Sequence, residues 1–279
     1  MKLSVVLINY KTPDQLIGCI ESIYATANGI DDVIVVDNDS QDESIELVQK
    51  KFPEVRIVAS KLNGGFAMAA NWGVSLARYD TVLILNPDIV VREGAIQKLY
   101  DRLHSSADIA IVAPKLLNLD ETLQYSCSKF HKFMTPVYRR TALGKTSFGK
   151  KELERFEMRS WDHNNEQDID WAIGAALMMK RKIVERVGLM DSRFFLYFED
   201  VDLCRRVWEA GYRVVYVPDA VMLHEHKRLS ANQAGLKSLR NRITRIHLGS
   251  WIQYVLKNKG KLHVHKGSVS GNKRPQSAP

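Results

Sequence analysis

An aspartate stands at the end of a short apolar run, in the segment LILNPD from Leu83 to Asp88. The proline prevents the preceding strand from pairing onward, so Asp88 is held in a rigid turn at the strand end. A carboxylate fixed there suits a divalent cation, which prefers oxygen ligands. Asn and Asp next to proline also form common turns without a metal. Asp88 alone therefore leaves both interpretations open.

A second acidic group follows an aromatic segment. Four of the five residues from Phe194 to Phe198 are aromatic, and Glu199, Asp200 and Asp202 come next. Aromatic surroundings disfavour the ionised carboxylate and raise its pKa toward the range of a general base. Acidic residues are also favoured in the first turn of a helix by its dipole. That alternative explains one or two acids more easily than three.

Asp37 directly follows the apolar run 33–36 and precedes Asn38. At a strand end it can accept hydrogen bonds from a base or a ribose, or it can belong to a helix-capping turn. Ser40 with Glu43 fits a capping box, and this favours a binding role for Asp37.

A glycine pair follows the third apolar run, where Asn63, Gly64 and Gly65 precede a predicted helix. Glycines let backbone N–H groups approach a diphosphate closely, and a helix amino terminus favours the anion. A glycine pair alone is weak evidence because turns use it often. Its place at the predicted sheet edge favours phosphate binding.

His224 follows the apolar run 221–223. Imidazole at a strand end can complete a metal site or bond to a backbone carbonyl. A single histidine is more often structural, and neither neighbour, Glu225 or His226, is clearly a better candidate.

Apolar runs alternate with helical patterns through the first half of the chain. Strands are predicted at 3–8, 33–36, 55–58, 81–85 and 109–112, with helices at 14–26, 43–51, 66–77 and 93–103. Continuous Val, Ile and Leu is typical of a sheet covered on both faces. We therefore predict an α/β fold with a mostly parallel, helix-flanked sheet. Such sheets bind ligands beyond the carboxyl ends of their strands, which here are the loops 9–11, 37–42, 60–65 and 86–88.

The second half is less regular. Residues 119–166 are expected to form long loops, and order is expected again at 169–180, 194–198, 200–210, 212–217 and 221–223, with more antiparallel character. We predict a main domain at 1–226, with a nucleotide-binding half at 1–113 and a smaller mixed acceptor half at 114–226. A basic amphipathic helical segment should follow at 227–266, with its helix at 233–256, and a disordered tail at 267–279.

The charge of the chain is concentrated at its end. The net charge is +8, yet residues 226–279 hold twelve Lys and Arg and no Asp or Glu, which leaves 28 basic against 32 acidic residues in residues 1–225.

The three cysteines, Cys19, Cys127 and Cys204, show no paired spacing, which fits a reducing cytosol. No apolar stretch reaches the ~20 residues needed to cross a bilayer, and the first run lacks the cleavage site of a signal peptide.

The motifs occur together in one order, and their combination is specific. The chain resembles the family 2 glycosyltransferases, and most of all the bacterial rhamnosyltransferases that extend lipid-linked glycans, over roughly residues 3 to 226. The segments that carry the resemblance are Val5 to Lys11, Val35 to Asn38, Asn63 to Gly73, Leu85 to Asp88, Trp171 with Gly174 and Ala175, and Glu199 to Leu203.

The resemblance implies the GT-A fold, inversion at the anomeric carbon and a requirement for Mg²⁺ or Mn²⁺. It implies that Asp88 binds the cation, joined by His224, and that Asp200 takes the proton from the acceptor hydroxyl, with Glu199 and Asp202 as supporting acids. The remaining implied residues bind the nucleotide (Asn9, Tyr10, Asp37, Asn38, Asn63, Gly64, Gly65 and Asn86) or line the sugar pocket (Trp171, Gly174 and Ala175).

One position departs from the family pattern. The metal motif usually reads Asp-any-Asp, whereas its first position here is Asn86. A neutral amide weakens cation affinity, so the metal is expected to arrive chiefly with the phosphates of the donor.

The expected reaction moves L-rhamnose from dTDP-rhamnose to a polyprenyl-diphosphate-linked saccharide, at the inner face of the cytoplasmic membrane. A UDP-glucose or UDP-galactose donor remains open. A sugar nucleotidyltransferase is disfavoured because no glycine-rich segment with Arg and Lys lies near the first strand. A nucleic-acid-binding protein is disfavoured because the basic tail has few aromatic residues to stack on bases.

The predicted final helix offers a contact with the membrane. Leu236, Leu239, Ile243 and Ile246 form one stripe, with Lys237, Arg240, Arg242 and Arg245 around it. Such a helix can lie on an anionic membrane surface. It can equally pack on the domain and leave its basic face in water. The sequence does not indicate an oligomeric state.

Overall fold

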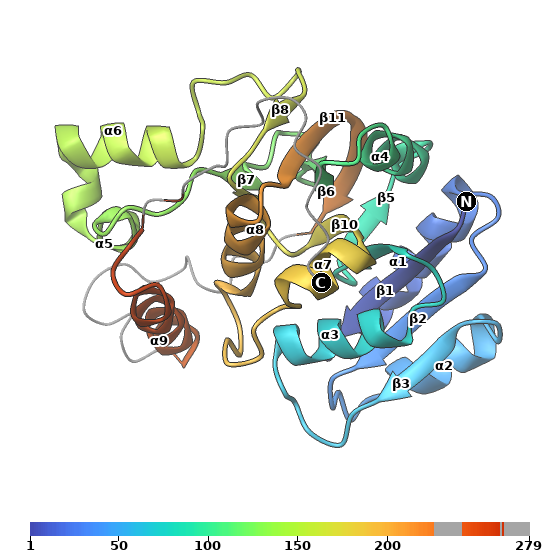
Figure 1. Ribbon diagram of the computed structural model, residues 1–279. Coiled ribbons are helices and arrows are strands. Elements are labelled where there is room, and N and C mark those ends of the chain that lie inside the picture. Colours follow the sequence, from blue (N-terminus) through green and yellow to red (C-terminus); the bar gives the residue numbers. More distant parts are fainter. Residues whose placement is uncertain (226–241, 263, 265–279) are drawn as a thin grey trace, which may run out of the picture.

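A single twisted sheet forms the centre of the protein, described here from a computed structural model at residues 1–225, 242–262 and 264 (Figure 1). The strand order is β3-β2-β1-β4-β10-β6-β11-β5, and β8 pairs with β11. The strands of this sheet are β1 Leu3–Asn9, β2 Asp32–Asp37, β3 Arg56–Ala59, β4 Thr81–Leu85, β5 Ile89–Val91, β6 Ile109–Leu117, β8 Gln167–Asp168, β10 Ala176–Lys180 and β11 Arg213–His224.

The first four strands are parallel to one another, as predicted. β10 enters the sheet antiparallel to both β4 and β6, and β5 is antiparallel to β11. The antiparallel character expected of the second half is thus confirmed. The register pairs Asn9 with Asp37, so the ends of β1 and β2 lie at the same edge.

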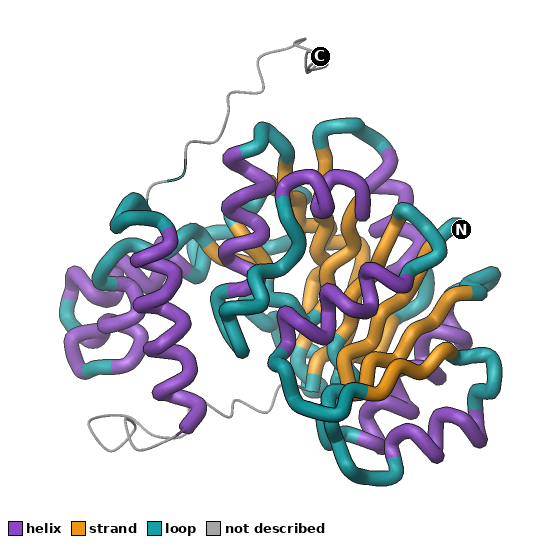
Figure 2. The backbone as a smooth tube through the Cα atoms, turned by 60° about the horizontal axis from the view of Figure 1, so that its bottom comes forward, coloured by secondary structure: helices purple, strands orange, loops and turns teal. Residues whose placement is uncertain are grey.

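Helices cover both faces of the sheet (Figure 2), because the strand side chains alternate between two apolar clusters. Leu3, Val5 and Leu7 of β1 pack with α1 (Pro13–Thr26), α2 (Ser44–Lys51) and α4 (Ala95–His104). Val6 and Ile8 belong to the opposite cluster, which includes α3 (Phe66–Leu76), α7 (Arg181–Val187) and α8 (Glu199–Glu209).

The prediction of long loops at 119–166 is wrong in its central part. This segment contains α5 (Thr135–Arg140), the 3₁₀ helix η1 (Ala142–Lys145) and α6 (Ser147–Phe156), with the short strand β7 (Cys127–Ser128) paired to β9 (Trp171–Ala172). The helices are too short for a clear apolar period. Cap chemistry marks η1 and α6, where the Thr141 hydroxyl accepts a hydrogen bond from Leu143 N–H and the Thr146 hydroxyl accepts one from Gly149 N–H.

Two further local predictions are wrong. The Ser40 side chain caps no helix, because it bonds to Asn9 and to the Lys11 N–H; Asp42 instead accepts from Ser44 at the start of α2. The strands expected at 212–217 and 221–223 are one strand, β11, with an irregularity between Val217 and Val221.

The final helix packs on the domain. α9 spans Arg242–Lys257 and buries Trp251 and Tyr254, and Ser250 donates a hydrogen bond to Leu196 O. Ile243 and Ile246 of the predicted stripe are half-buried, while Leu236 and Leu239 lie outside the described residues. The predicted tail at 267–279 also lies outside them. No described helix is long and apolar enough to span a membrane.

Candidate functional site

The ends of β1 and β2 hold four polar side chains that we call the β1–β2 edge: Asn9, Asp37, Asn38 and Ser40. Asn9 donates to Asp37 Oδ1 at 2.7 Å and to Ser40 Oγ at 3.0 Å, while Asp37 Oδ2 accepts from Ser40 N–H. All four are at least nine-tenths buried. Tyr10, by contrast, is exposed, with Lys11 over its ring. The edge is therefore a closed polar network with an exposed aromatic ring next to it.

The glycine pair is tied to this edge. Gly64 N–H donates to Asn38 Oδ1 and Gly65 N–H donates to Asn63 Oδ1. Gly65 has a φ of 85°, and a Cβ there would overlap the backbone of Phe195. Glycine is thus required for a close approach between two loops, and the predicted use of these N–H groups for a phosphate stays a prediction.

Asp88 lies against His224. Asp88 Oδ1 is buried, has no hydrogen-bond donor among the described residues, and lies 3.3 Å from His224 Nε2. His224 Nδ1 lies 2.6 Å from Gln124 Oε1, and Gln124 Nε2 donates to Asn118. Because a carbonyl oxygen only accepts, Nδ1 carries the proton and Nε2 faces the carboxylate.

This pair fits a divalent cation. In the neutral imidazole, the Nε2 lone pair and a carboxylate oxygen repel each other at 3.3 Å unless a proton or a cation lies between them. Among the described residues there is no group of three or more His, Cys, Asp or Glu side chains suited to a metal. A cation held by Asp88 and His224 therefore needs further oxygen ligands from a bound molecule.

The start of α8 is built from an irregular turn. Tyr197 and Phe198 both have a φ of 71°, which is costly for aromatic residues. Phe198 is buried and packs against the rings of His131, Trp251 and Tyr254. The aromatic packing holds the turn in place. Residues 194–198, expected to form a regular element, thus form an irregular turn. The packing of its aromatic residues holds Glu199 and Asp200 in the protein interior.

Asp200 is buried, and its carboxylate accepts from Gly174 N–H at 3.0 Å and from Val201 N–H at 2.7 Å. Burial raises the pKa of Asp200 to about 6 against these two bonds, the direction predicted from the aromatic segment. Burial, and then the charge on Asp200, raise the pKa of Glu199 well above its usual range. A carboxylate that titrates near neutral pH can accept a proton during catalysis.

Two further predicted residues, Asp202 and Trp171, have partners within the protein. Asp202 pairs with Arg206 at 2.8 Å and with Lys257 of α9 at 2.7 Å, so its carboxylate joins α8 to α9. Trp171 is buried, stacks on His131 and donates through Nε1 to Lys129 O. Both residues support the surroundings of Asp200.

The two acidic parts of the site are joined by one short segment. Ala175 O accepts from Asn86 N–H at 2.8 Å, while the adjacent Gly174 N–H bonds to Asp200. Gly174 also lies against Phe66, next to the glycine pair. The loops that carry Asn86, Gly65 and Asp200 are thus contiguous through residues 174–175.

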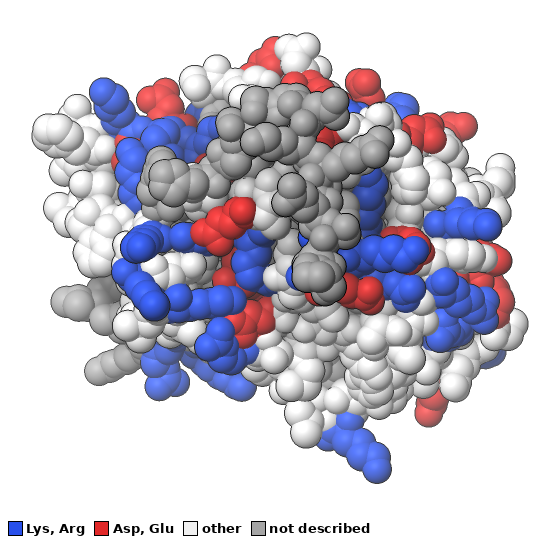
Figure 3. Space-filling model, viewed as in Figure 1, with Lys and Arg blue, Asp and Glu red and all other residues white. Residues whose placement is uncertain are grey.

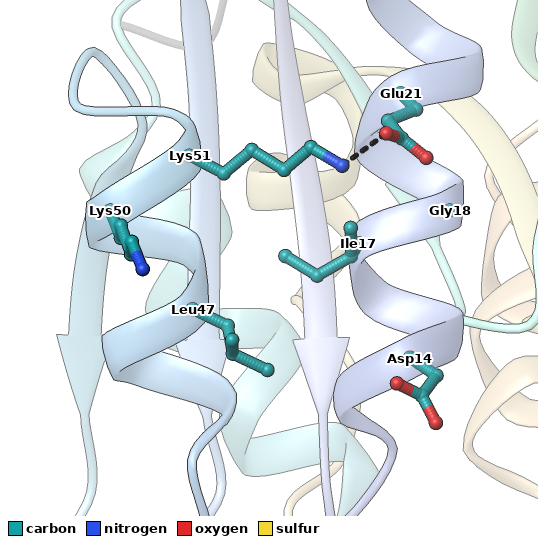
Figure 4. Close-up of a pocket in the computed structure, with 7 residues that line it drawn as sticks. All are labelled: Asp14, Ile17, Gly18, Glu21, Leu47, Lys50 and Lys51. Carbon is teal, nitrogen blue, oxygen red and sulfur yellow. Dashed lines mark hydrogen bonds and ion pairs between the residues drawn. The ribbon is translucent and has the colours of Figure 1, made fainter.

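A surface groove of about 470 Å³ lies between α1 and α2, away from these residues (Figure 4). It is lined by Asp14, Glu21, Lys50 and Lys51 among others, and an ion pair between Lys51 and Glu21 crosses it. None of the predicted site residues lines this groove.

Sequence reasoning missed Gln124. It lies in the segment where no periodic pattern was visible, and a glutamine carries no signal of its own. His226, named as an alternative to His224, lies outside the described residues. Glu225 N–H donates to Asp88 O, so the backbone after His224 also contacts the turn.

Solved structures define the fold. GalNAc-T7 with UDP, GalNAc and Mn²⁺ has a TM-score of 0.64 at 14% identity, over 91% of this chain and 47% of that chain. The mannosyltransferase PcManGT of Pyrobaculum calidifontis, with GDP-Man and Mn²⁺, has a TM-score of 0.59 at 18% identity, over 92% and 64%. The fold is that of a GT-A glycosyltransferase, as predicted.

The family follows from the sequence comparison. Residues 4–188 match Glycosyl transferase family 2, and the chain belongs to this family. It is 26% identical to N-acetylglucosaminyl-diphospho-decaprenol L-rhamnosyltransferase of Mycobacterium tuberculosis, over 83% of this chain and 78% of that protein. It is 25% identical to the low-salt glycan biosynthesis hexosyltransferase Agl10 of Haloferax volcanii, over 73% of this chain and 61% of that protein.

Proposed function

We propose that the protein transfers a sugar, with inversion, from a nucleoside diphosphate to a hydroxyl group of a lipid-linked saccharide. The family and the relatives named for rhamnosyl and hexosyl transfer support the reaction class. The observation that carries the mechanism is Asp200, a buried carboxylate with a raised pKa that accepts a hydrogen bond from Gly174, next to the residue that contacts Asn86.

In the proposed reaction, Asp200 takes the proton of the acceptor hydroxyl while the oxygen of that hydroxyl attacks the anomeric carbon of the donor sugar. The bond from that carbon to the phosphate oxygen breaks on the opposite face, and its electron pair leaves with the nucleoside diphosphate. Asp88 and His224 would hold Mg²⁺ or Mn²⁺. When bound, the cation neutralises the charge that grows on the leaving diphosphate.

The remaining roles follow the chain order. The half at 1–113 would bind the nucleotide through Asp37 and the residues around it, with Tyr10 against the base. The half at 114–226 would hold the acceptor and the sugar, with Gly174 and Ala175 between the two. Glu199 would act as a supporting acid, buried beside Asp200.

L-Rhamnose from dTDP-rhamnose is the proposed donor. The relative from Mycobacterium tuberculosis is named for L-rhamnosyl transfer, and so is rhamnosyltransferase WbbL of Escherichia coli, at 23% identity over 64% of this chain. A UDP-hexose is the second candidate, favoured by the hexosyltransferase relative. The acceptor would be reached at the inner face of the cytoplasmic membrane, by peripheral attachment.

Incubation with a panel of nucleotide sugars, Mn²⁺ and a polyprenyl-diphosphate saccharide tests the proposal. We expect nucleoside diphosphate release and a product one sugar longer with dTDP-rhamnose. Transfer only from a UDP-hexose would select the second donor. Absence of transfer from every donor, with a protein that binds none of them, would contradict the proposal.

A further inference from the structure

A helical lobe lies beside the sheet, on the side of the acceptor half (Figure 1). We define the lobe as residues 129–159, which include α5, η1 and α6, together with 242–262, which include α9. The two parts lie side by side in both ribbon views and meet where His131 contacts Trp251. The aromatic cluster around Phe198 joins the lobe to the start of α8.

The charge of the lobe differs from that of the remaining described chain. Residues 129–159 hold nine Lys and Arg against three Asp and Glu, a net charge of +6. Residues 242–262 hold five Lys and Arg and no acid, whereas residues 1–128 and 160–225 together carry 19 against 29, a net charge of −10. Figure 3 shows the Lys and Arg side chains gathered over the lobe, at its left.

Large apolar side chains are exposed on the same lobe. Phe148 at the start of α6 is 82% exposed and Phe133 before α5 is 66% exposed, with Leu143 and Met134 also exposed nearby. Lys145, Lys150 and Lys151 form no ion pair among the described residues, and all three are exposed. On α6, Glu154 is an exposed acidic residue close in sequence to Lys150 and Lys151.

The outer face of α9 also combines exposed apolar side chains with exposed basic side chains. Leu248, Ile252 and Leu256 follow one another at intervals of four, so they lie on one side of the helix, and they are 42%, 50% and 72% exposed. Arg242 and Arg245 are exposed on the preceding turns. The opposite side carries Trp251 and Tyr254 into the core.

We propose that the lobe surface formed by Phe133, Leu143, Phe148 and the outer face of α9 binds an anionic lipid bilayer. Exposed apolar groups between unpaired cations match a bilayer, where apolar groups enter the acyl boundary and cations meet the headgroups. Nucleic acid is a poorer match, because the aliphatic side chains of this surface cannot stack on bases. The surface is the part of the chain that brings α8 close to a lipid-borne acceptor, and this link alone rests on the proposed function.

Cosedimentation of the full chain with vesicles tests the surface. We expect binding to phosphatidylcholine vesicles that contain phosphatidylglycerol, and little binding to phosphatidylcholine alone. Lys150→Glu with Lys151→Glu should weaken binding by at least about 30-fold, since each cation lost near the surface removes about a factor of five and the two added carboxylates are repelled by the anionic headgroups. The matched control, Lys2→Glu with Lys50→Glu, makes the same charge change on exposed residues far from the lobe. Its vesicle binding should weaken far less.

The apolar part needs its own variants. Phe133→Ser with Phe148→Ser, and separately Ile252→Ser with Leu256→Ser, should each weaken vesicle binding about tenfold or more and leave the melting temperature unchanged, because these side chains are exposed. Equal loss in the control, or no preference for the anionic vesicles, would overturn the proposal. So would a homodimer that these variants dissociate, or tighter binding to random DNA through the same lysines. Failure of sugar transfer leaves vesicle binding intact, so the two proposals fail separately.

Discussion

The β1–β2 edge and the start of α8 are both buried and polar, but they are built differently. At the edge, Asn9, Asp37 and Ser40 bond to one another at the ends of regular strands. At the start of α8, Glu199 Oε2 has no hydrogen-bond partner among the described residues, and the backbone before it is left-handed at two aromatic residues. A preformed network suits binding, whereas a strained turn that keeps a carboxyl poorly solvated suits proton transfer.

Replacing the carboxylate of Asp200 should separate the two regions most sharply. Asp200→Asn keeps the bond from Gly174 N–H but removes the base, so kcat should fall about 10³-fold while donor affinity changes little. Steady-state rates and calorimetry with the donor measure the two quantities. Glu209→Gln, at the exposed end of the same helix, is the matched control and should retain its rate. Undiminished turnover in Asp200→Asn would remove this residue from the role of base.

Asp88→Ala should instead act on the pair of Asp88 and His224, which lies outside both regions compared above. It leaves His224 as the single described side chain of the pair, so Mn²⁺-dependent binding of a nucleoside diphosphate should weaken about 100-fold, or about 2.7 kcal/mol. Calorimetry with and without Mn²⁺ measures this change. Binding that stays equally strong and equally dependent on Mn²⁺ would place the cation elsewhere.

Gln124→Ala should have a smaller effect of the same kind. Gln124 fixes the proton of His224 on Nδ1, and loss of such a partner lowers metal affinity about tenfold. Mn²⁺ titration followed by electron paramagnetic resonance reads this out without activity. Gln124→Glu retains an acceptor and should restore most of the affinity. If both variants bind Mn²⁺ as the native protein does, Gln124 has no positioning role.

The pH dependence should report on the start of α8. Burial raises the pKa of Asp200 to about 6, so the base becomes protonated as the pH falls through that value. We expect kcat/KM to fall by about tenfold for each unit below that midpoint and to level off above it. The profile measured in saturating Mn²⁺ tests this. A midpoint near 4, the value of an exposed carboxyl, would show that the turn does not hold Asp200 out of water.

The difference between regular strand ends and irregular turns also determines which site residues could be predicted from the sequence. Strand ends such as Asp37 and Asp88 were predictable because continuous apolar runs mark buried strands, and the ends of parallel strands share one edge. Asp200 was marked by its aromatic neighbours. Gln124 was not predictable, because its role depends on a contact with a residue 100 positions away.

Local chemistry could also mislead. Ser40 and Glu43 have the spacing of a capping box, yet Ser40 bonds across to Asn9 because tertiary contacts outweighed a weak local preference. For α9, the predicted stripe at Ile243 and Ile246 faces partly inward, since Trp251 and Tyr254 offer more area to bury and set the rotation of the helix.

α9 contacts α8 through Lys257, and this contact can affect either the stability of the protein alone or also the solvation of Asp200 at the start of α8. Lys257 donates a hydrogen bond to Asp191 and forms an ion pair with Asp202, a carboxylate that is 1% exposed and keeps Arg206 as its other partner. Lys257→Met leaves a buried charge partly unpaired, so the free energy of unfolding should fall by about 1–3 kcal/mol. Urea denaturation measures the loss.

Asp202→Asn together with Lys257→Met should cost less than the sum of the two single losses, because the two charges interact directly. In both variants the pH midpoint of kcat/KM should stay near that of the native protein, since Asp200 bonds to Gly174 and Val201 and not to α9. A midpoint that moves with Lys257→Met would mean that α9 controls the solvation of Asp200. The binding of the lobe to a bilayer could then alter the acidity of the catalytic carboxyl.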